Sequence, residues 1–185
     1  MSFKIFGVVF NISYIFALSL TLFIAFDRSG NFLPLLVSVV IHECSHLIVM
    51  CFLGAKPKEI SLLMGTINIK NSKILTFGEE IVVLLAGPIS NLIVYLFSLA
   101  HNLNFSNTNL ILFILNLLFI EGLDGGSILK LVLEKYLSLK TANNIMKIIK
   151  IINIGLFVAF FLFCLKQNIK NYTIIFFIIY ILIKW

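Results

Sequence analysis

Long apolar stretches, separated by short polar segments, run along almost the whole chain and restrict its fold more than any other feature. Of the 185 residues, 61% are hydrophobic and 12% are charged, whereas a soluble domain has about 45–50% apolar and about 25% charged residues. A transmembrane helix needs about 20 predominantly apolar residues, so this length leaves room for roughly six or seven spans. The sequence therefore excludes a soluble globular domain and predicts a polytopic membrane protein.

The apolar stretches predict an all-α fold with about six transmembrane helices. The expected spans cover residues 5–26, 32–53, 81–100, 110–120, 148–165 and 172–183. The first stretch is too long for the apolar core of a signal peptide, so we expect it to remain as a helix. No polar region is long enough for a second domain, and residues 1–185 are expected to form a single domain.

Basic residues predict how the chain is oriented in the bilayer. The net charge is +6, from 14 Lys and Arg against 8 Asp and Glu. With a cytoplasmic N-terminus, most of these basic residues fall in cytoplasmic segments, which predicts that both termini are cytoplasmic. Basic residues placed between apolar stretches are typical of contact with anionic lipid head groups, and they argue against nucleic acid as a partner.

The polar segment between the second and third expected spans has a different pattern. Residues 66–70 alternate between polar and apolar types, Asn71 and Ser72 favour a turn, and residues 73–76 follow with weaker alternation. This pattern predicts a small β-hairpin over residues 66–76 at the cytoplasmic face. An irregular interfacial loop is the alternative.

A capping box is expected where the third span begins. Thr76 is followed three residues later by Glu79, the spacing at which the two side chains cap each other's backbone N–H groups. Glu79 and Glu80 are also favourable at the positive end of a helix dipole. We therefore expect a helix to start next to Thr76.

The sequence His42-Glu43-Cys44-Ser45-His46 lies inside an otherwise apolar span. Residues four apart on a helix lie on one face, about 6 Å from each other, so both imidazoles can bind one metal ion. Zinc suits these ligands, and Glu43 is placed to take a proton from the attacking water. The alternative is a hydrogen-bonded cluster that holds helices together, but the cost of ionisable groups at membrane depth favours a functional site.

Catalytic zinc sites usually have three protein ligands, so a further ligand is expected elsewhere in the chain. Of the remaining acidic residues, only Glu121 and Asp124 lie at the end of an apolar stretch. Gly125 and Gly126 follow Asp124 and give the backbone the freedom to turn its carboxylate inward. Asp124 is therefore the expected third ligand, with Glu121 as the alternative.

These residues resemble the site-2 protease family of intramembrane zinc metalloproteases, over residues 32–128. The resemblance rests on three motifs, which are His42-Glu43-x-x-His46, Gly87-Pro88-x-x-Asn91 and Asn116 followed eight residues later by Asp124-Gly125. The family's usual prolines before this Asp are replaced here by Phe119 and by Glu121-Gly122.

The resemblance implies a role for each of these residues. It implies one zinc ion per chain, held by His42, His46 and Asp124, with Glu43 as the catalytic base. It also implies a cleft that binds the substrate and is lined by Gly87, Pro88, Asn91 and Asn116.

By this resemblance, the protein is an endopeptidase that cleaves a membrane-tethered or membrane-associated regulatory protein near the cytoplasmic face of a bacterial cell membrane. Without a PDZ-sized insertion, the chain looks most like the stage IV sporulation branch, whose substrate is a sigma-factor precursor. The CBS domain often found in that branch is absent from the sequence. Membrane proteins that regulate or inhibit the enzyme are further expected partners.

Two other functions stay open at this point. Another type of membrane zinc peptidase, which processes lipoproteins or C-termini or removes misfolded proteins, usually pairs HExxH with a downstream Glu. In that case Glu121 or Glu134 is the third ligand. A non-catalytic metal-binding scaffold or transporter is the other alternative, although such a protein has no need of Glu43.

Overall fold

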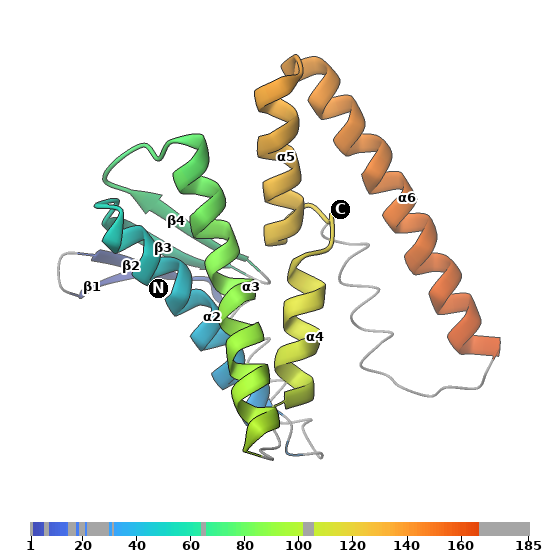
Figure 1. Ribbon diagram of the computed structural model, residues 1–185, viewed down its shortest axis with the longest axis horizontal. Helices are drawn as coiled ribbons and strands as arrows, with labels where there is room; N and C mark the ends of the chain where they lie inside the picture. The colour runs from blue at the N-terminus through green and yellow to red at the C-terminus, as the bar shows by residue number, and fades with distance from the viewer. Residues whose placement is uncertain are drawn as a thin grey trace. The chain divides into compact units, whose positions relative to one another are not determined.

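The computed structural model describes residues 2–5, 8–14, 18, 21, 30, 32–63, 66–101 and 106–166 (Figure 1). Its strands are β1 (Ser2–Ile5), β2 (Val8–Ile12), β3 (Pro57–Leu63) and β4 (Thr66–Asn71). Its helices are α2 (Phe32–Phe52), α3 (Phe77–Ala100), α4 (Ser106–Asn116), α5 (Asp124–Tyr136) and α6 (Leu139–Lys166).

The chain forms two compact units. Unit 1 comprises Met1–Leu118 and Gly122–Ile128, and unit 2 comprises Phe119–Glu121 and Leu129–Trp185. Unit 1 therefore contains the strands, α2, α3, α4 and the start of α5, whereas unit 2 contains the rest of α5 and α6.

Three helices in the described part of the chain are long and apolar enough to cross a membrane, and they cover Phe32–Phe52, Phe77–Ala100 and Leu139–Ala159. They correspond to the spans expected at 32–53, 81–100 and 148–165. The span expected at 110–120 corresponds to α4, which begins and ends four residues earlier, at Ser106 and Asn116. With 11 residues, α4 is shorter than the three candidate spans. The span expected at 172–183 lies outside the described residues.

The prediction that a transmembrane helix begins at residue 5 is wrong. β1 and β2 form an antiparallel hairpin, and β2 pairs in parallel with β3, from Val9 opposite Glu59 to Ile12 opposite Leu62. A short run of Val, Ile and Phe suits a strand as well as a buried helix, and the pairing with a distant strand decides between them. Most of the rest of the expected span, up to residue 26, lies outside the described residues.

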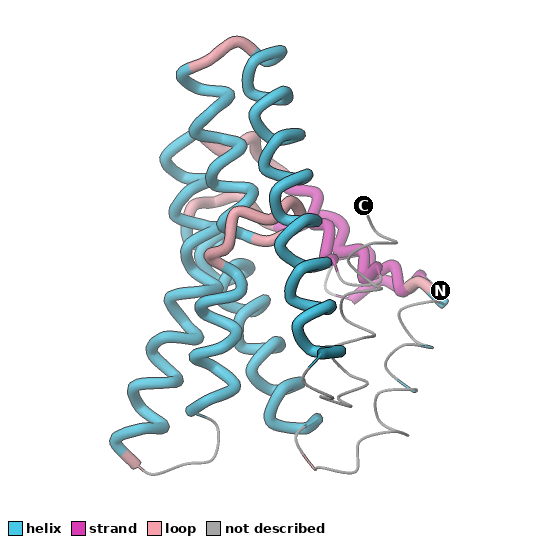
Figure 2. The backbone as a smooth tube through the Cα atoms, turned by 90° about the vertical axis from the view of Figure 1, so that its right-hand side faces the viewer, coloured by secondary structure: helices cyan, strands magenta, loops and turns pink. Residues whose placement is uncertain are grey.

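The four strands form one small sheet in the order β1-β2-β3-β4; Figure 2 draws the strands in magenta. The fold is therefore mostly helical and not all-α. The strand expected at 66–70 is present, but its partner is β3 and not residues 73–76, so that half of the predicted hairpin is wrong. Residues 73–76 instead lead into α3, and Thr76 caps that helix. The alternation of Glu59, Ile60, Ser61 and Leu62 is the signal for β3 that the sequence prediction did not use.

The predicted capping box is confirmed. Thr76 Oγ1 accepts a hydrogen bond from the Glu79 backbone N–H at 3.4 Å, and Glu79 Oε2 accepts one from the Thr76 N–H at 2.7 Å. Lys73 Nζ lies 2.9 Å from Glu79 Oε1. These contacts fix the residue at which α3 begins, and with it the positions of the buried residues further along the helix.

In unit 1, α3 packs against both α2 and α4. The buried residues of α2 are Ser38, His42, His46 and Met50, so one narrow face with a four-residue repeat turns away from the surface. Other apolar side chains of α2 and α3, such as Val40, Ile48 and Ile93, are exposed. This distribution suits helices that present apolar side chains to lipid and polar ones to their neighbours.

Candidate metal centre

The two histidines of the HExxH sequence lie one turn apart on the buried face of α2. His42 is 5% exposed and His46 is 7% exposed. Glu43, between them in sequence, is partly buried. Because residues 42 and 46 are four apart, their side chains leave the helix on the same side, and their ring centroids are 4.8 Å apart.

Asp124 is the first residue of α5, and two glycines hold it in place. Gly122 has a φ of 90°, in the left-handed region that favours glycine, and it turns the chain after α4. Gly125 is buried against the backbone that directly follows α4, where a Cβ atom would lie 2.8 Å from the Leu118 carbonyl oxygen and closer still to that of Leu117. This backbone and the start of α5 therefore approach each other in a way that a larger residue at 125 does not allow.

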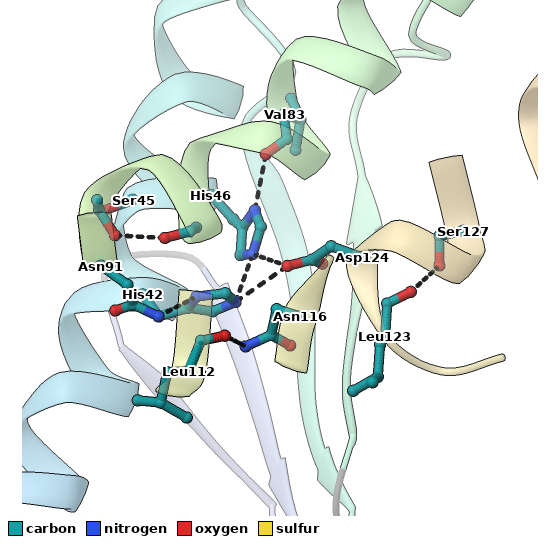
Figure 3. A network of polar contacts seen from close by, with 12 residues as sticks. His42, Ser45, His46, Val83, Asn91, Leu112, Asn116, Leu123, Asp124 and Ser127 are labelled. Atoms are coloured by element: carbon teal, nitrogen blue, oxygen red, sulfur yellow. Dashed lines mark hydrogen bonds and ion pairs between the residues drawn. The ribbon is translucent and has the colours of Figure 1, made fainter. Parts of the chain in front are cut away.

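Asp124 meets the two histidines at one point (Figure 3). His42 Nε2 lies 3.2 Å from His46 Nε2, and Asp124 Oδ2 lies 3.1 Å from His42 Nε2 and 3.5 Å from His46 Nε2. Ligand atoms on a tetrahedral zinc ion, with bonds of about 2.0–2.2 Å, are about 3.3–3.6 Å from one another. The three observed separations lie inside this range or within about 0.2 Å of it, and so suit three ligands of one zinc ion.

The hydrogen bonds around these atoms also fit a cation. His46 Nδ1 lies 2.7 Å from the Val83 carbonyl oxygen, which can only accept, so Nδ1 carries a hydrogen, and in the neutral ring Nε2 then has the lone pair that a metal needs. Asp124 Oδ2 is buried and has no hydrogen-bond partner among the residues that the structure describes, although both imidazoles lie near it. A metal ion bound by Nε2 and Oδ2 satisfies these atoms together, so the three residues fit zinc.

Gly87 on α3 closes one side of the site. A Cβ atom at this position would lie 2.6 Å from His42 Nε2 and closer still to His46 Nε2. Gly87 and Pro88 are both buried. Any side chain at 87 would thus occupy the place of the metal-binding nitrogens. This observation gives Gly87 a steric role beside the ligands.

The two asparagines of the sequence motifs lie in different surroundings. Asn91 is fully buried, and its Nδ2 lies 3.0 Å from His42 Nδ1. Asn116 is partly buried, and its Nδ2 donates to the Leu112 carbonyl oxygen of its own helix at 3.0 Å. The structure therefore brings Asn91 to the metal site, whereas the hydrogen bond of Asn116 stays within α4.

The other acidic residues do not join the cluster. Within the described ranges, His42, His46 and Asp124 are the only three His, Cys, Asp or Glu residues whose ligand atoms all lie within 4.8 Å of one another. Glu121 is exposed and Glu134 is not a member of the group. Of the three candidates for third ligand, the structure supports Asp124. One supporting contact had no signal in the sequence, because Val83 acts through its backbone carbonyl.

No protein-family model and no curated protein matches this chain. Among solved structures, it is similar to Site-2 Protease from Methanocaldococcus jannaschii, with a TM-score of 0.68 and 28% sequence identity. The similarity covers 98% of this chain and 92% of that chain.

The two histidines of HExxH lie on an apolar helix and meet a distant Asp at one buried site, whose donors fit one zinc ion. Together with the structural similarity, this site defines the class of multi-pass membrane metalloproteases. The chain is a homologue of the site-2 type of intramembrane zinc metalloprotease, and its His-His-Asp metal site is intact.

Proposed function

We propose that this protein is an endopeptidase that hydrolyses a peptide bond of a membrane-tethered or membrane-associated regulatory protein, near the cytoplasmic face of the membrane. The observation that carries this proposal is the meeting of His42, His46 and Asp124 on the buried side of an apolar helix, with Glu43 in the same helical turn. A scaffold that only binds metal has no need of that carboxylate.

In the proposed reaction His42, His46 and Asp124 would hold the zinc ion, and Glu43 acts as the general base. Zinc supplies Lewis acidity, which polarises the scissile carbonyl and makes water easier to deprotonate. Glu43 takes one proton from the attacking water as the water oxygen bonds to the carbonyl carbon. Glu43 then delivers this proton to the amide nitrogen as the C–N bond breaks, which leaves a carboxylic acid and an amine.

The finer features of the proposal rest on the sequence. Basic residues between the apolar stretches favour cytoplasmic termini, and the apolar stretches favour about six spans in one domain. We include in the proposal a bacterial cell membrane, a substrate such as a sigma-factor precursor, and regulatory or inhibitory membrane partners. Gly87, Pro88 and Asn116 are proposed to line the cleft that binds the substrate, and Asn91, which contacts His42, is proposed to lie beside it.

The test is cleavage of a co-expressed membrane-tethered substrate by the wild-type chain and by Glu43→Gln. General acid–base catalysis contributes about 10²–10⁴-fold, so we expect Glu43→Gln to lose cleavage by about that factor while it keeps its zinc. Glu121→Gln is the control, because this exposed carboxylate lies outside the metal cluster. Full cleavage by a zinc-loaded Glu43→Gln enzyme would refute the proposed mechanism.

A further inference from the structure

Asn91 lies on the side of His42 that faces away from the metal-binding nitrogen. Its side chain is 0% exposed, and its amide group meets Nδ1 of the imidazole while Nε2 of the same ring points to His46 and Asp124 (Figure 3). A fully buried amide in contact with a metal ligand is in a poor position to bind substrate. Its contacts instead suggest an effect on the ligand itself.

The two histidines are supported by α3 in the same way. His46 Nδ1 meets the Val83 carbonyl oxygen at 2.7 Å, and His42 Nδ1 meets the Asn91 amide at 3.0 Å. The later histidine on α2 thus pairs with the earlier residue on α3, as expected for antiparallel helices. Val83 and Asn91 are both buried. The outer nitrogens of both imidazoles are therefore held by one helix.

The chemistry of His42 determines what Asn91 has to supply. If Nε2 binds a metal it must offer a lone pair, so the ring hydrogen is on Nδ1 and needs an acceptor. Of the two amide atoms, Oδ1 accepts and Nδ2 only donates. Half a turn about the Cβ–Cγ bond exchanges the two atoms without changing the shape of the side chain. In the described part of the chain Oδ1 has no hydrogen-bond partner, so the exchange breaks no bond to that atom.

We infer that Asn91 is a positioning residue for the metal centre. Its Oδ1 accepts the hydrogen of His42 Nδ1, and it thereby fixes both the tautomer and the ring orientation in which Nε2 binds zinc. This inference rests on the proposed function, because it assumes that the His-His-Asp site holds the catalytic metal. It assigns Asn91 to the metal, whereas the sequence motif placed it in the cleft that binds the substrate.

The experiment measures zinc affinity in the full-length chain by competition with a chromophoric chelator, for Asn91→Leu and Asn91→Asp. Leu keeps the approximate size but offers no acceptor, and loss of such an outer partner typically costs about 10–100-fold in metal affinity. Asp offers only acceptor oxygens. We therefore expect Asn91→Asp to bind zinc more tightly than a folded Asn91→Leu chain does, with an affinity close to that of the wild type. The absorption of bound Co²⁺ provides a second readout of the ligand geometry.

Three controls make the result decisive. Ser98→Ala removes another buried polar side chain of α3, 2% exposed, away from the site, and should leave zinc affinity unchanged. Thermal unfolding of the zinc-free proteins shows whether each variant folds. If Asn91→Leu does not fold, Asn91→Ser replaces it, since its hydroxyl is too short to reach His42.

Each result supports or overturns the inference. Weaker zinc binding in Asn91→Leu with recovery in Asn91→Asp supports it. Unchanged zinc affinity in Asn91→Leu overturns it, as does an equal loss in both variants, because that loss indicates packing alone. His42→Ala separates this outcome from failure of the proposed function. If His42→Ala binds zinc as the wild type does, the metal site itself is wrong.

Discussion

The metal-binding nitrogens of His42 and His46 lie against a glycine, and this contact limits what residue 87 can be. A Cβ atom there would overlap both imidazoles. In a close-packed interior such an overlap forces side chains out of their preferred rotamers or moves the backbone. Gly87 thus has a steric reason to be glycine, separate from any kink at the neighbouring Pro88.

We predict that Gly87→Ala loses zinc and is destabilised by about 1–3 kcal/mol, the usual cost of overpacking. Zinc content after purification and thermal unfolding in detergent measure the two effects. Gly78→Ala is the matched control, because it lies in the same helix and a Cβ atom there meets nothing within 4 Å. A zinc-loaded Gly87→Ala protein as stable as Gly78→Ala would contradict this view of the site.

At the scale of single residues, part of the site could be predicted and part could not. His42, Glu43 and His46 share one helical turn, so local periodicity was enough to group the two histidines. Asp124 was found because few acidic residues lie near an apolar stretch. The contacts of Val83 and Asn91 depend on how α3 packs against α2, and no local pattern in the sequence specifies that packing.

At the scale of elements, Glu59 connects three strands of the sheet. Its Oε1 accepts from Asn11 Nδ2 of β2 at 2.8 Å, and its Oε2 lies 2.7 Å from Lys70 Nζ of β4. Lys70 chiefly, with help from Ser61 and Asn11, holds the pKa of Glu59 below its ordinary value of 4.5. In the folded sheet, the ionised form of the Glu59 side chain is therefore favoured over the protonated form.

This shift predicts how the sheet responds to acid. Because the folded-state pKa is lowered, the contribution of Glu59 is present above pH 4.5 and is lost as the pH falls through the lower folded-state value. We expect the backbone amides of β3 and β4 to lose protection from hydrogen exchange over that range in the wild type. Glu59→Gln, compared at each pH, should be less protected at neutral pH and should change less on acidification. Identical pH dependence in the two proteins would contradict the role given to Glu59.

The sheet also shows where sequence patterns stop being informative. The start of α3 was predicted correctly because Thr76 and Glu79 are close in sequence and form a local motif. The pairing of β2 with β3 joins residues 8–12 to residues 57–63, across the whole of α2. The same apolar letters suit a membrane helix, so only this long-range pairing identifies the N-terminal residues as strands.

At the scale of the whole molecule, all three ligands belong to unit 1. His42 and His46 are in its continuous part, and Asp124 is in the returning segment Gly122–Ile128. A metal ion bound to all three links α2 to the start of α5, which are far apart in the sequence. Since an ion that binds only the folded state shifts the folding equilibrium, zinc is expected to stabilise this unit.

We predict that removal of zinc with a chelator lowers the unfolding temperature of the wild type. The stabilisation is about 2.7 kcal/mol when free zinc is 100 times its dissociation constant. Asp124→Asn should unfold at the same temperature with and without zinc, because it lacks the anionic ligand. Glu121→Gln should respond to zinc as the wild type does. Loss of the zinc effect in Glu121→Gln alone would assign the third ligand to Glu121 and favour the other class of membrane zinc peptidase.

The support of both imidazoles by α3 has a consequence for how this sequence can change over time. Each residue added to a helix rotates all later residues about the helix axis by about 100°. One insertion or deletion between Val83 and Asn91 would therefore leave only one of the two histidines supported. This stretch of α3 has to keep a constant length across related sequences. Its exposed apolar positions, such as Ile89, are free to exchange among residues that lipid tolerates.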